Sequence, residues 1–209
     1  MSLRYYLYIS DAKVDMLLPQ VDPGFARKRS AEVGVNVPFL SAKRSVDAQA
    51  DRVARLERVV RYVDDFCDVG TVDEPGQYVR GRLTMRWGPL AGGQAVYFGG
   101  STEHTVVGLG GASGHVLGAA APAEGSQVFA PSSVPGLLGG LAATIADDEV
   151  PPSALASVHV ANRLVRGAEQ EVEFLAKRLL HGPSPYPELD AHDDMTVLLA
   201  SPLFVALAD

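Results

Sequence analysis

Residues 78–110 read YVRGRLTMRWGPLAGGQAVYFGGSTEHTVVGLG. Apolar residues occupy every second position in parts of this stretch, and pairs of glycines separate those parts. Alternation with a period of two is typical of strands, and adjacent glycines are typical of turns. We therefore expect a central β-meander, and the pattern predicts its strands at 78–87, 94–99, 104–110 and 114–119.

The glycine cluster in TVVGLGGASGHV, which starts at Thr105, raises the question of a phosphate-binding turn. A dinucleotide-binding turn needs Gly-x-Gly-x-x-Gly leading into a helix. Counted from Gly108, the sixth position is Ser113, and the residues that follow are too few and too rich in glycine for that helix. We therefore interpret Gly110 and Gly111 as a hairpin turn with positive φ angles, and we expect no cofactor.

Both ends of the chain are also predicted strands. Arg4–Ser10 alternates and is rich in aromatic and β-branched residues, which favour strands. Met195–Leu207 is apolar, with an expected interruption at Ser201–Pro202 because proline cannot donate to a central ladder. Ala31–Leu40 alternates as well. Apolar strands at both ends favour a single domain over residues 1–209.

Helices are expected where apolar residues recur at spacings of three and four. Two such stretches predict main helices at 45–67 and 162–181. Shorter elements complete the set: a helix from Ser10 or Asp11 to Leu18 that Pro19 ends, a helix at Val134–Ala146, and a segment at 155–160 that fits either strand or helix. These elements predict an α+β protein, with a largely antiparallel or mixed sheet around the central β-meander, covered by the two main helices.

The composition restricts the class of partner. The chain has 209 residues, a formal net charge of −7 and a pI of about 5.2. That charge gives no positive field for a phosphate backbone, so we expect no nucleic-acid partner. The single cysteine, Cys67, cannot form an intrachain disulfide. No signal-peptide pattern opens the chain, and its uncharged runs are broken by glycine and proline, so we expect a cytoplasmic protein without a membrane span.

Charge is distributed unevenly along the chain. Between Trp87 and Ala146 the only formal charges are Glu103 and Glu124. Such a segment either buries both faces of its strands or leaves a neutral surface that something else must cover. We interpret part of it as an interface, and we expect a homo-oligomer.

Three arginines are the main ligand-binding candidates. A period of two places Arg80, Arg82 and Arg86 on one face of the first strand of the meander. Arginines in such a row can hold carboxylate or phosphate groups through bidentate hydrogen bonds. The alternative is an amphipathic edge strand whose arginines are solvated or paired with acids such as Asp64 and Asp65.

Ser10 and Asp11 are a second polar candidate. They follow an apolar strand, and open α/β sheets place their ligands where strands end. A plain helix N-cap explains the same two residues equally well.

His104 and His115 are weak catalytic candidates, expected near opposite ends of the two strands that flank the Gly110–Gly111 turn. Two histidines without a third ligand make a poor zinc site. The tail at 190–194 offers three carboxylates and an imidazole, and we interpret it as a solvated loop. We expect no metal.

Three stretches resemble a conserved family of high-GC bacteria that has no known activity. They are RYYLYISDAKVDMLLPQ near the start, VYFGGS with VVGLGG in the middle, and VLLASPLFVA near the end. The resemblance implies a single-domain protein of unknown function and carries over no catalytic residue.

These features favour a non-enzymatic binding or regulatory protein that self-associates through its neutral central segment and can take a small anionic ligand at the arginine face. The alternative is an enzyme acting on a small phosphorylated or carboxylated metabolite, with His104 or His115 as general acid or base. A pocket holding both a histidine and an arginine of this strand would favour the enzyme.

Overall fold

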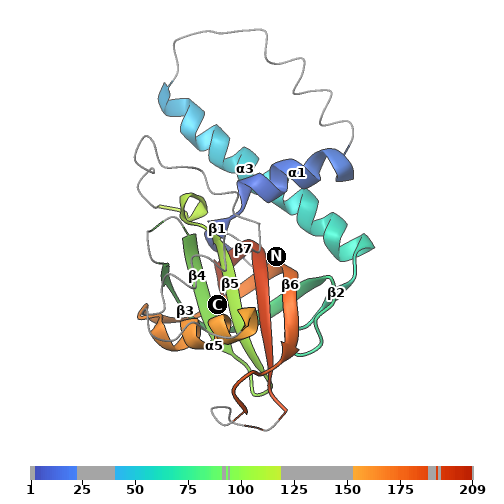
Figure 1. Ribbon diagram of the computed structural model, residues 1–209. Helices are drawn as coiled ribbons and strands as arrows, with labels where there is room; N and C mark the ends of the chain where they lie inside the picture. Colours follow the sequence, from blue (N-terminus) through green and yellow to red (C-terminus); the bar gives the residue numbers. More distant parts are fainter. Residues whose placement is uncertain are drawn as a thin grey trace. The chain divides into compact units, whose positions relative to one another are not determined.

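The computed structural model describes most of the chain, and of residues 41–49 it describes only the helical backbone. The described residues are 3–22, 41–90, 93, 95–118, 153–187, 192 and 194–208. They fall into two compact units, residues 1–10 together with 68–209, and Asp11–Cys67. Figure 1 shows the elements of each unit along the sequence. The predicted strand at 31–40 and the predicted helix at 134–146 lie outside the described residues.

Five strands of the first unit close on themselves. Each pairs with two others, in the cyclic order β3–β4–β5–β7–β6 and back to β3. Their bounds are Tyr78–Pro89 for β3, Ala95–Ser101 for β4, Thr105–Ala112 for β5, Glu169–Pro183 for β6 and Thr196–Leu207 for β7. The first four lie in the order β6–β3–β4–β5, a Greek key. The OB fold is likewise a five-stranded Greek-key barrel, although a partly open one.

Two short strands extend this sheet. β1 (Tyr5–Ile9) pairs antiparallel with β7, and β2 (Val69–Gly70) pairs parallel with β3. The β5–β7 pair is also parallel, so the sheet is mixed, and the α+β class is as expected. Strands from both ends of the chain belong to one sheet, as expected. That the whole chain forms a single domain is still only a prediction.

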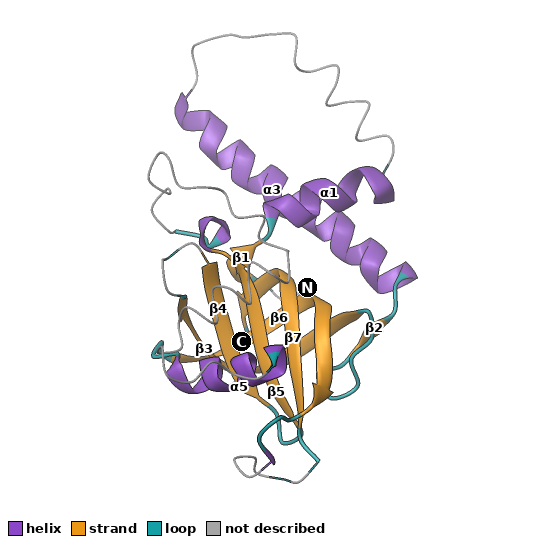
Figure 2. Ribbon diagram, in the orientation of Figure 1, coloured by secondary structure: helices purple, strands orange, loops and turns teal. Residues whose placement is uncertain are grey.

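The core of this unit has two parts. Alternate residues of the five strands point into the closed sheet, where Phe98, Phe174 and Val205 belong to one buried cluster. The opposite faces of β4, β5 and β7 form a second cluster with Val158 and Ala161 of helix α5 (Ala154–Leu164). Figure 2 shows α5 lying against the outside of the sheet, where it contacts β4, β5 and β7. The segment 155–160, which fitted strand or helix, is therefore helical.

Burial explains why charge is missing from the described part of the central segment. All residues of β5 from Thr105 to Gly111 are buried, and so are Val96 to Gly99 of β4. One face of these strands lines the interior and the other packs near α5, so a charge would be desolvated on either side. Residues 119–146, nearly half of the segment that contains the predicted interface, lie outside the described residues.

The predicted helix at 162–181 is wrong. The chain leaves α5 at Leu164 and continues as β6, in which Val172, Phe174 and Ala176 alternate into the buried core. Leucine, alanine and valine residues happened to recur at helical spacing, but the true period here is two. Long-range pairing with both β3 and β7 outweighs local helix propensity.

The predicted hairpin turn at Gly110 and Gly111 is also wrong. Both residues lie within the continuous strand β5, and the only described residues with positive φ are Gly93 and Gly118. A Cβ atom on Gly111 would collide with the ring of Tyr8, so this glycine makes room for a buried aromatic side chain. The fourth meander strand is replaced by a 3-10 turn at Ser113–His115 and a single bridge between Val116 and Tyr8.

β7 is not interrupted at Ser201–Pro202. It runs through both residues, with irregular register to β6 next to Pro202. On its other side β7 pairs with β5 up to Ala200 and with β1 from Phe204, so Pro202 lies where one partner strand gives way to the next. A proline is tolerated there because the ladder is already irregular.

The second unit contains two helices that contact each other, α1 (Asp11–Val21) and α3 (Ser41–Phe66). α3 confirms the helix predicted at 45–67, whereas α1 continues past Pro19 to Val21. No helix in the described parts of the chain is long and apolar enough to cross a membrane.

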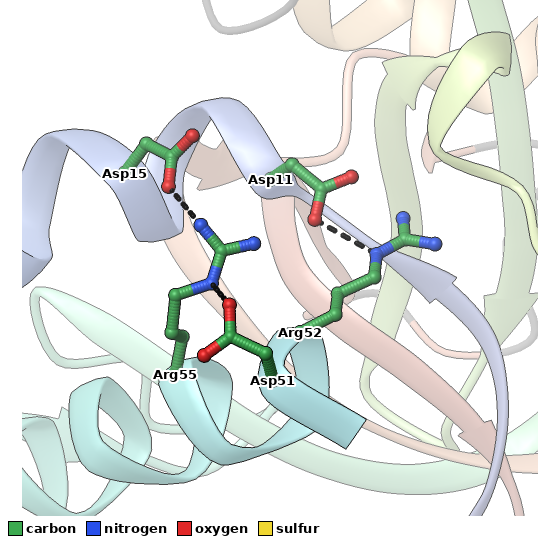
Figure 3. Close-up of polar contacts among 5 residues, drawn as sticks. All are labelled: Asp11, Asp15, Asp51, Arg52 and Arg55. Atoms are coloured by element: carbon green, nitrogen blue, oxygen red, sulfur yellow. Dashed lines mark hydrogen bonds and ion pairs between the residues drawn. The ribbon is translucent and has the colours of Figure 1, made fainter. Parts of the chain in front are cut away.

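Ion pairs join α1 to α3, as Figure 3 shows. Arg52 Nε lies 2.8 Å from Asp11 Oδ1, and Arg55 Nη1 lies 2.6 Å from Asp15 Oδ1. Arg55 also contacts Asp51, four residues earlier on its own helix, at 3.1 Å. The Arg52–Asp11 pair, together with an Arg55 guanidinium shared between Asp15 and Asp51, fixes which faces of the two helices meet.

Candidate functional site

The predicted arginine face is paired with glutamates of β6. Arg82 Nε lies 2.7 Å from Glu171 Oε1, and Arg86 Nη2 lies 2.7 Å from Glu169 Oε1. Arg80 is engaged in contacts as well. We call the Arg82–Glu171 and Arg86–Glu169 pairs the arginine–glutamate ladder. Arg82 and Arg86 thus pair with acids of the neighbouring strand.

The ladder arises from register. β3 and β6 are antiparallel, and Arg86 lies directly opposite Glu169, while Glu171 faces Thr84, two residues along from Arg82. Opposite charges on one face of neighbouring strands attract each other, although exposed pairs contribute only about 0–1 kcal/mol. The ladder cancels most of the positive charge that the sequence placed on this face.

A polar pocket lies at one end of the ladder. It has a volume of about 360 Å³ and is lined by residues of β3, β4, α5 and the start of β6: Thr84, Arg86, Gly99, Gly100, Ser101, Asn162 and Glu169. Arg86 lies opposite Gly99 in the β3–β4 pair, and the Asn162 side chain occupies the space that a side chain of Gly99 would take. In the described part of the chain, the hydroxyl groups of Thr84 and Ser101 make no hydrogen bond.

Asn162, on the last turn of α5, forms one wall of the pocket and anchors the helix to the sheet. Its Oδ1 accepts a hydrogen bond from the Tyr97 hydroxyl at 2.7 Å. Its Nδ2 donates to the carbonyl oxygens of Gly100 and Val107, at 2.9 and 3.0 Å. Burial raises the pKa of Tyr97, so the hydroxyl stays protonated and donates.

Two glycines make this close approach possible. A Cβ atom on Gly99 would collide with Asn162 Oδ1, and one on Gly108 would collide with the Tyr97 hydroxyl and meet Val158 of α5. These residues belong to the VYFGGS and VVGLGG stretches. Gly99 and Gly108 therefore allow α5 to pack closely against the sheet, and neither residue has the positive φ of a turn.

The two candidate histidines lie apart. The eight residues of β5, a span of about 26 Å in an extended strand, lie between them, followed by Ser113 and Gly114. The His104 ring lies 6.1 Å from that of His192, and the His115 ring lies 5.9 Å from that of Tyr8. The expectation that they lie on two strands flanking a Gly110–Gly111 hairpin turn is wrong, because β5 continues through both glycines. Neither histidine lines the pocket that contains Arg86.

The remaining candidates, Ser10 and Asp11, make contacts that stabilise the fold. Ser10 is fully buried and its backbone N–H donates to the Leu203 carbonyl at 2.9 Å. Asp11 begins α1 and pairs with Arg52. On the same helix Lys13 is buried, and this burial lowers its pKa to about 7. Among the described residues no group of three or more histidines, cysteines and acids is arranged to hold a metal.

Sequence reasoning found Arg86 but missed the residues that surround it in the pocket. Glu169 lay in a segment interpreted as a helix. No sequence motif marks the other three polar residues, Thr84, Ser101 and Asn162. One signal was available: Glu169, Glu171 and Glu173 alternate, as acids on the wet face of a strand do.

The described residues thus define a small α+β protein with a closed, barrel-like sheet and a polar pocket beside an anchored external helix. By sequence the chain belongs to the DUF7019 family, a family of unknown function whose model matches residues 4–209. The match agrees with the resemblance to an uncharacterised family, while a bacterial source stays an expectation. Searches of curated proteins and of solved structures gave no significant match.

Proposed function

We propose that this protein is a non-enzymatic binding or regulatory protein that takes a small polar ligand in the Arg86 pocket. One observation carries the proposal. Arg86, a predicted anion-binding residue, lines a hollow of about 360 Å³ together with hydroxyl groups that have no partner in the described chain. Ligand sites commonly have volumes of about 300–1,000 Å³ and a few convergent polar groups.

Arginine suits this role because of its shape. Its planar guanidinium carries five N–H donors and can bind a carboxylate or phosphate with two parallel hydrogen bonds. In the described chain Arg86 contacts only Glu169, through Nη2, so donors are left for a ligand. The enzymatic alternative required a histidine beside the arginine, and no observation at this pocket favours it.

The test compares two arginines of the same strand face. Arg86→Lys keeps the charge but loses the planar fork, so we expect the affinity for a small carboxylate to fall about tenfold, the loss of one charged hydrogen bond. Arg82→Lys is the matched control, because Arg82 pairs with Glu171 but does not line the pocket. Binding is measured by titrating ¹⁵N-labelled protein with small carboxylates, amino acids and phosphates. Equal losses in both variants, or no binding by wild type, would contradict the proposal.

We also propose that the protein self-associates through the part of its neutral central segment that spans residues 119–146. The support is compositional, since Glu124 is the only formal charge in that range. Light scattering at micromolar concentration should give a mass above the 22.1 kDa of one chain. A monomeric mass at every concentration would reject this part of the proposal.

A further inference from the structure

The Arg86 pocket contains one positive and one negative side chain, and they touch each other. Arg86 Nη2 and Glu169 Oε1 lie 2.7 Å apart at its margin. The other lining residues, Thr84, Ser101, Asn162 and two glycines, carry no charge. The net charge of the lining is therefore zero, although the sequence pointed to an anion site.

This ion pair is accessible to exchange. The side chains of Arg86 and Glu169 are 49% and 60% exposed, so water screens their attraction and the pair opens at little cost. The guanidinium has five N–H donors and the carboxylate two acceptor oxygens. Each group therefore has capacity for a ligand in addition to, or in place of, its present partner.

The pairing discriminates between classes of ligand. A simple anion that binds Arg86 comes close to the Glu169 carboxylate, and like charges at that distance repel. A simple cation at Glu169 meets the same difficulty with Arg86. A molecule with both charges replaces one ion pair by two and leaves neither side chain uncompensated.

We propose that the ligand of this pocket is a small zwitterion of the free α-amino acid class, with its carboxylate on Arg86 and its ammonium group on Glu169. The inference rests on the proposed binding function. An α-amino acid carries its two charged groups on one carbon, so both can reach two side chains that already touch. A zwitterion takes the place of the purely anionic ligand that the arginine row predicted.

The uncharged lining suits the rest of such a molecule. The backbone of Gly99 and Gly100 lines the pocket, and the Thr84 and Ser101 hydroxyl groups can bind a polar side chain. Asn162 does not take part, because its Oδ1 and Nδ2 already bind Tyr97, Gly100 and Val107. A polar amino acid is therefore favoured over an apolar one.

The experiment uses ¹⁵N-labelled full-length protein and follows the backbone amide signals of Gly99, Gly100 and Ser101. The common L-amino acids are titrated one at a time. For the tightest of them, the matched 2-hydroxy acid and the matched decarboxylated amine are titrated in the same way, together with acetate and inorganic phosphate. We expect the amino acid to bind up to about fivefold more tightly than either matched analogue, since each analogue lacks one charged contact and an exposed charged contact contributes at most about 1 kcal/mol.

A charge-neutral variant makes the test specific. Glu169→Gln removes the partner of the ammonium group, so the preference should reverse and the 2-hydroxy acid should bind more tightly than the amino acid. Arg82→Lys is the control and should keep the wild-type order. Two results separate the inference from the proposed function. If acetate, phosphate or the 2-hydroxy acid binds wild type as tightly as the amino acid, the zwitterion inference fails and the binding function stands. If no compound perturbs these amides, both fail.

Discussion

Replacing Asn162 by alanine is expected to lower the free energy of unfolding by about 3 kcal/mol. The substitution leaves the Tyr97 hydroxyl without its 2.7 Å acceptor and the carbonyl oxygens of Gly100 and Val107 without their shared donor. A buried polar group that loses its partner costs about 1–3 kcal/mol. Tyr97 is fully buried and retains only a longer contact to the Val158 carbonyl at 3.2 Å. Urea denaturation followed by circular dichroism measures the loss.

Two further variants test the reason for this loss. Arg163→Ala changes the next residue of α5, which is exposed, and should alter stability by less than about 0.5 kcal/mol. Asn162→Asp keeps an acceptor for Tyr97 but removes the donor to both carbonyl oxygens, so its stability should also fall well below wild type. If Asn162→Ala were no more harmful than Arg163→Ala, the asparagine would not anchor the helix.

Replacing Gly111 by alanine is expected to cost about 2 kcal/mol, typical of overpacking a closed core. The added methyl group would overlap the ring and hydroxyl of Tyr8, which is itself fully buried against Phe98. The Tyr8 ring therefore cannot move aside without disturbing the core. The cause is steric, since the φ angle of Gly111 is not positive. Thermal and urea unfolding both measure the effect.

Gly88 supplies the matched control for this substitution. It lies in β3, also without a positive φ, and no atom comes within 4 Å of where its Cβ would be. Gly88→Ala should therefore change stability by about 0.5 kcal/mol or less, in the stabilising direction, because alanine restricts the unfolded chain. A similar loss in both variants would mean that the close approach of Tyr8 is not the cause.

Local pattern was sufficient for several elements. The strands predicted at 78–87 and 94–99 are β3 and β4, and the helix predicted at 45–67 is α3. In each, the apolar residues of the element recur with the period of the structure that forms. The three arginines of β3 were placed correctly on one outward face by the same argument, although their partners were not identified.

Local pattern failed where two periods overlap in one segment. Residues 162–181 contain apolar residues at helical spacing and also alternate from Glu169 to Ala176. Only pairing with β3, which is distant in sequence, and with β7, the next strand along the chain, selects the strand. The hairpin turn predicted at Gly110 and Gly111 was wrong for a related reason. Glycine occurs both in turns and where two parts of the chain pack closely. The Tyr8 ring that requires a glycine at position 111 lies near the start of the chain, so the local sequence does not reveal it.

The sequence by itself determined the α+β class, the main strands of the meander, the long helix α3 and the outward row of arginines, because each depends on residues close together in the chain. Only the tertiary structure decided the closed order of the five strands, the packing of α5 against glycines of the sheet, and the pairing of Arg86 with Glu169, 83 residues away. Contacts between distant residues depend on register and closure, and residue periodicity carries no information about either.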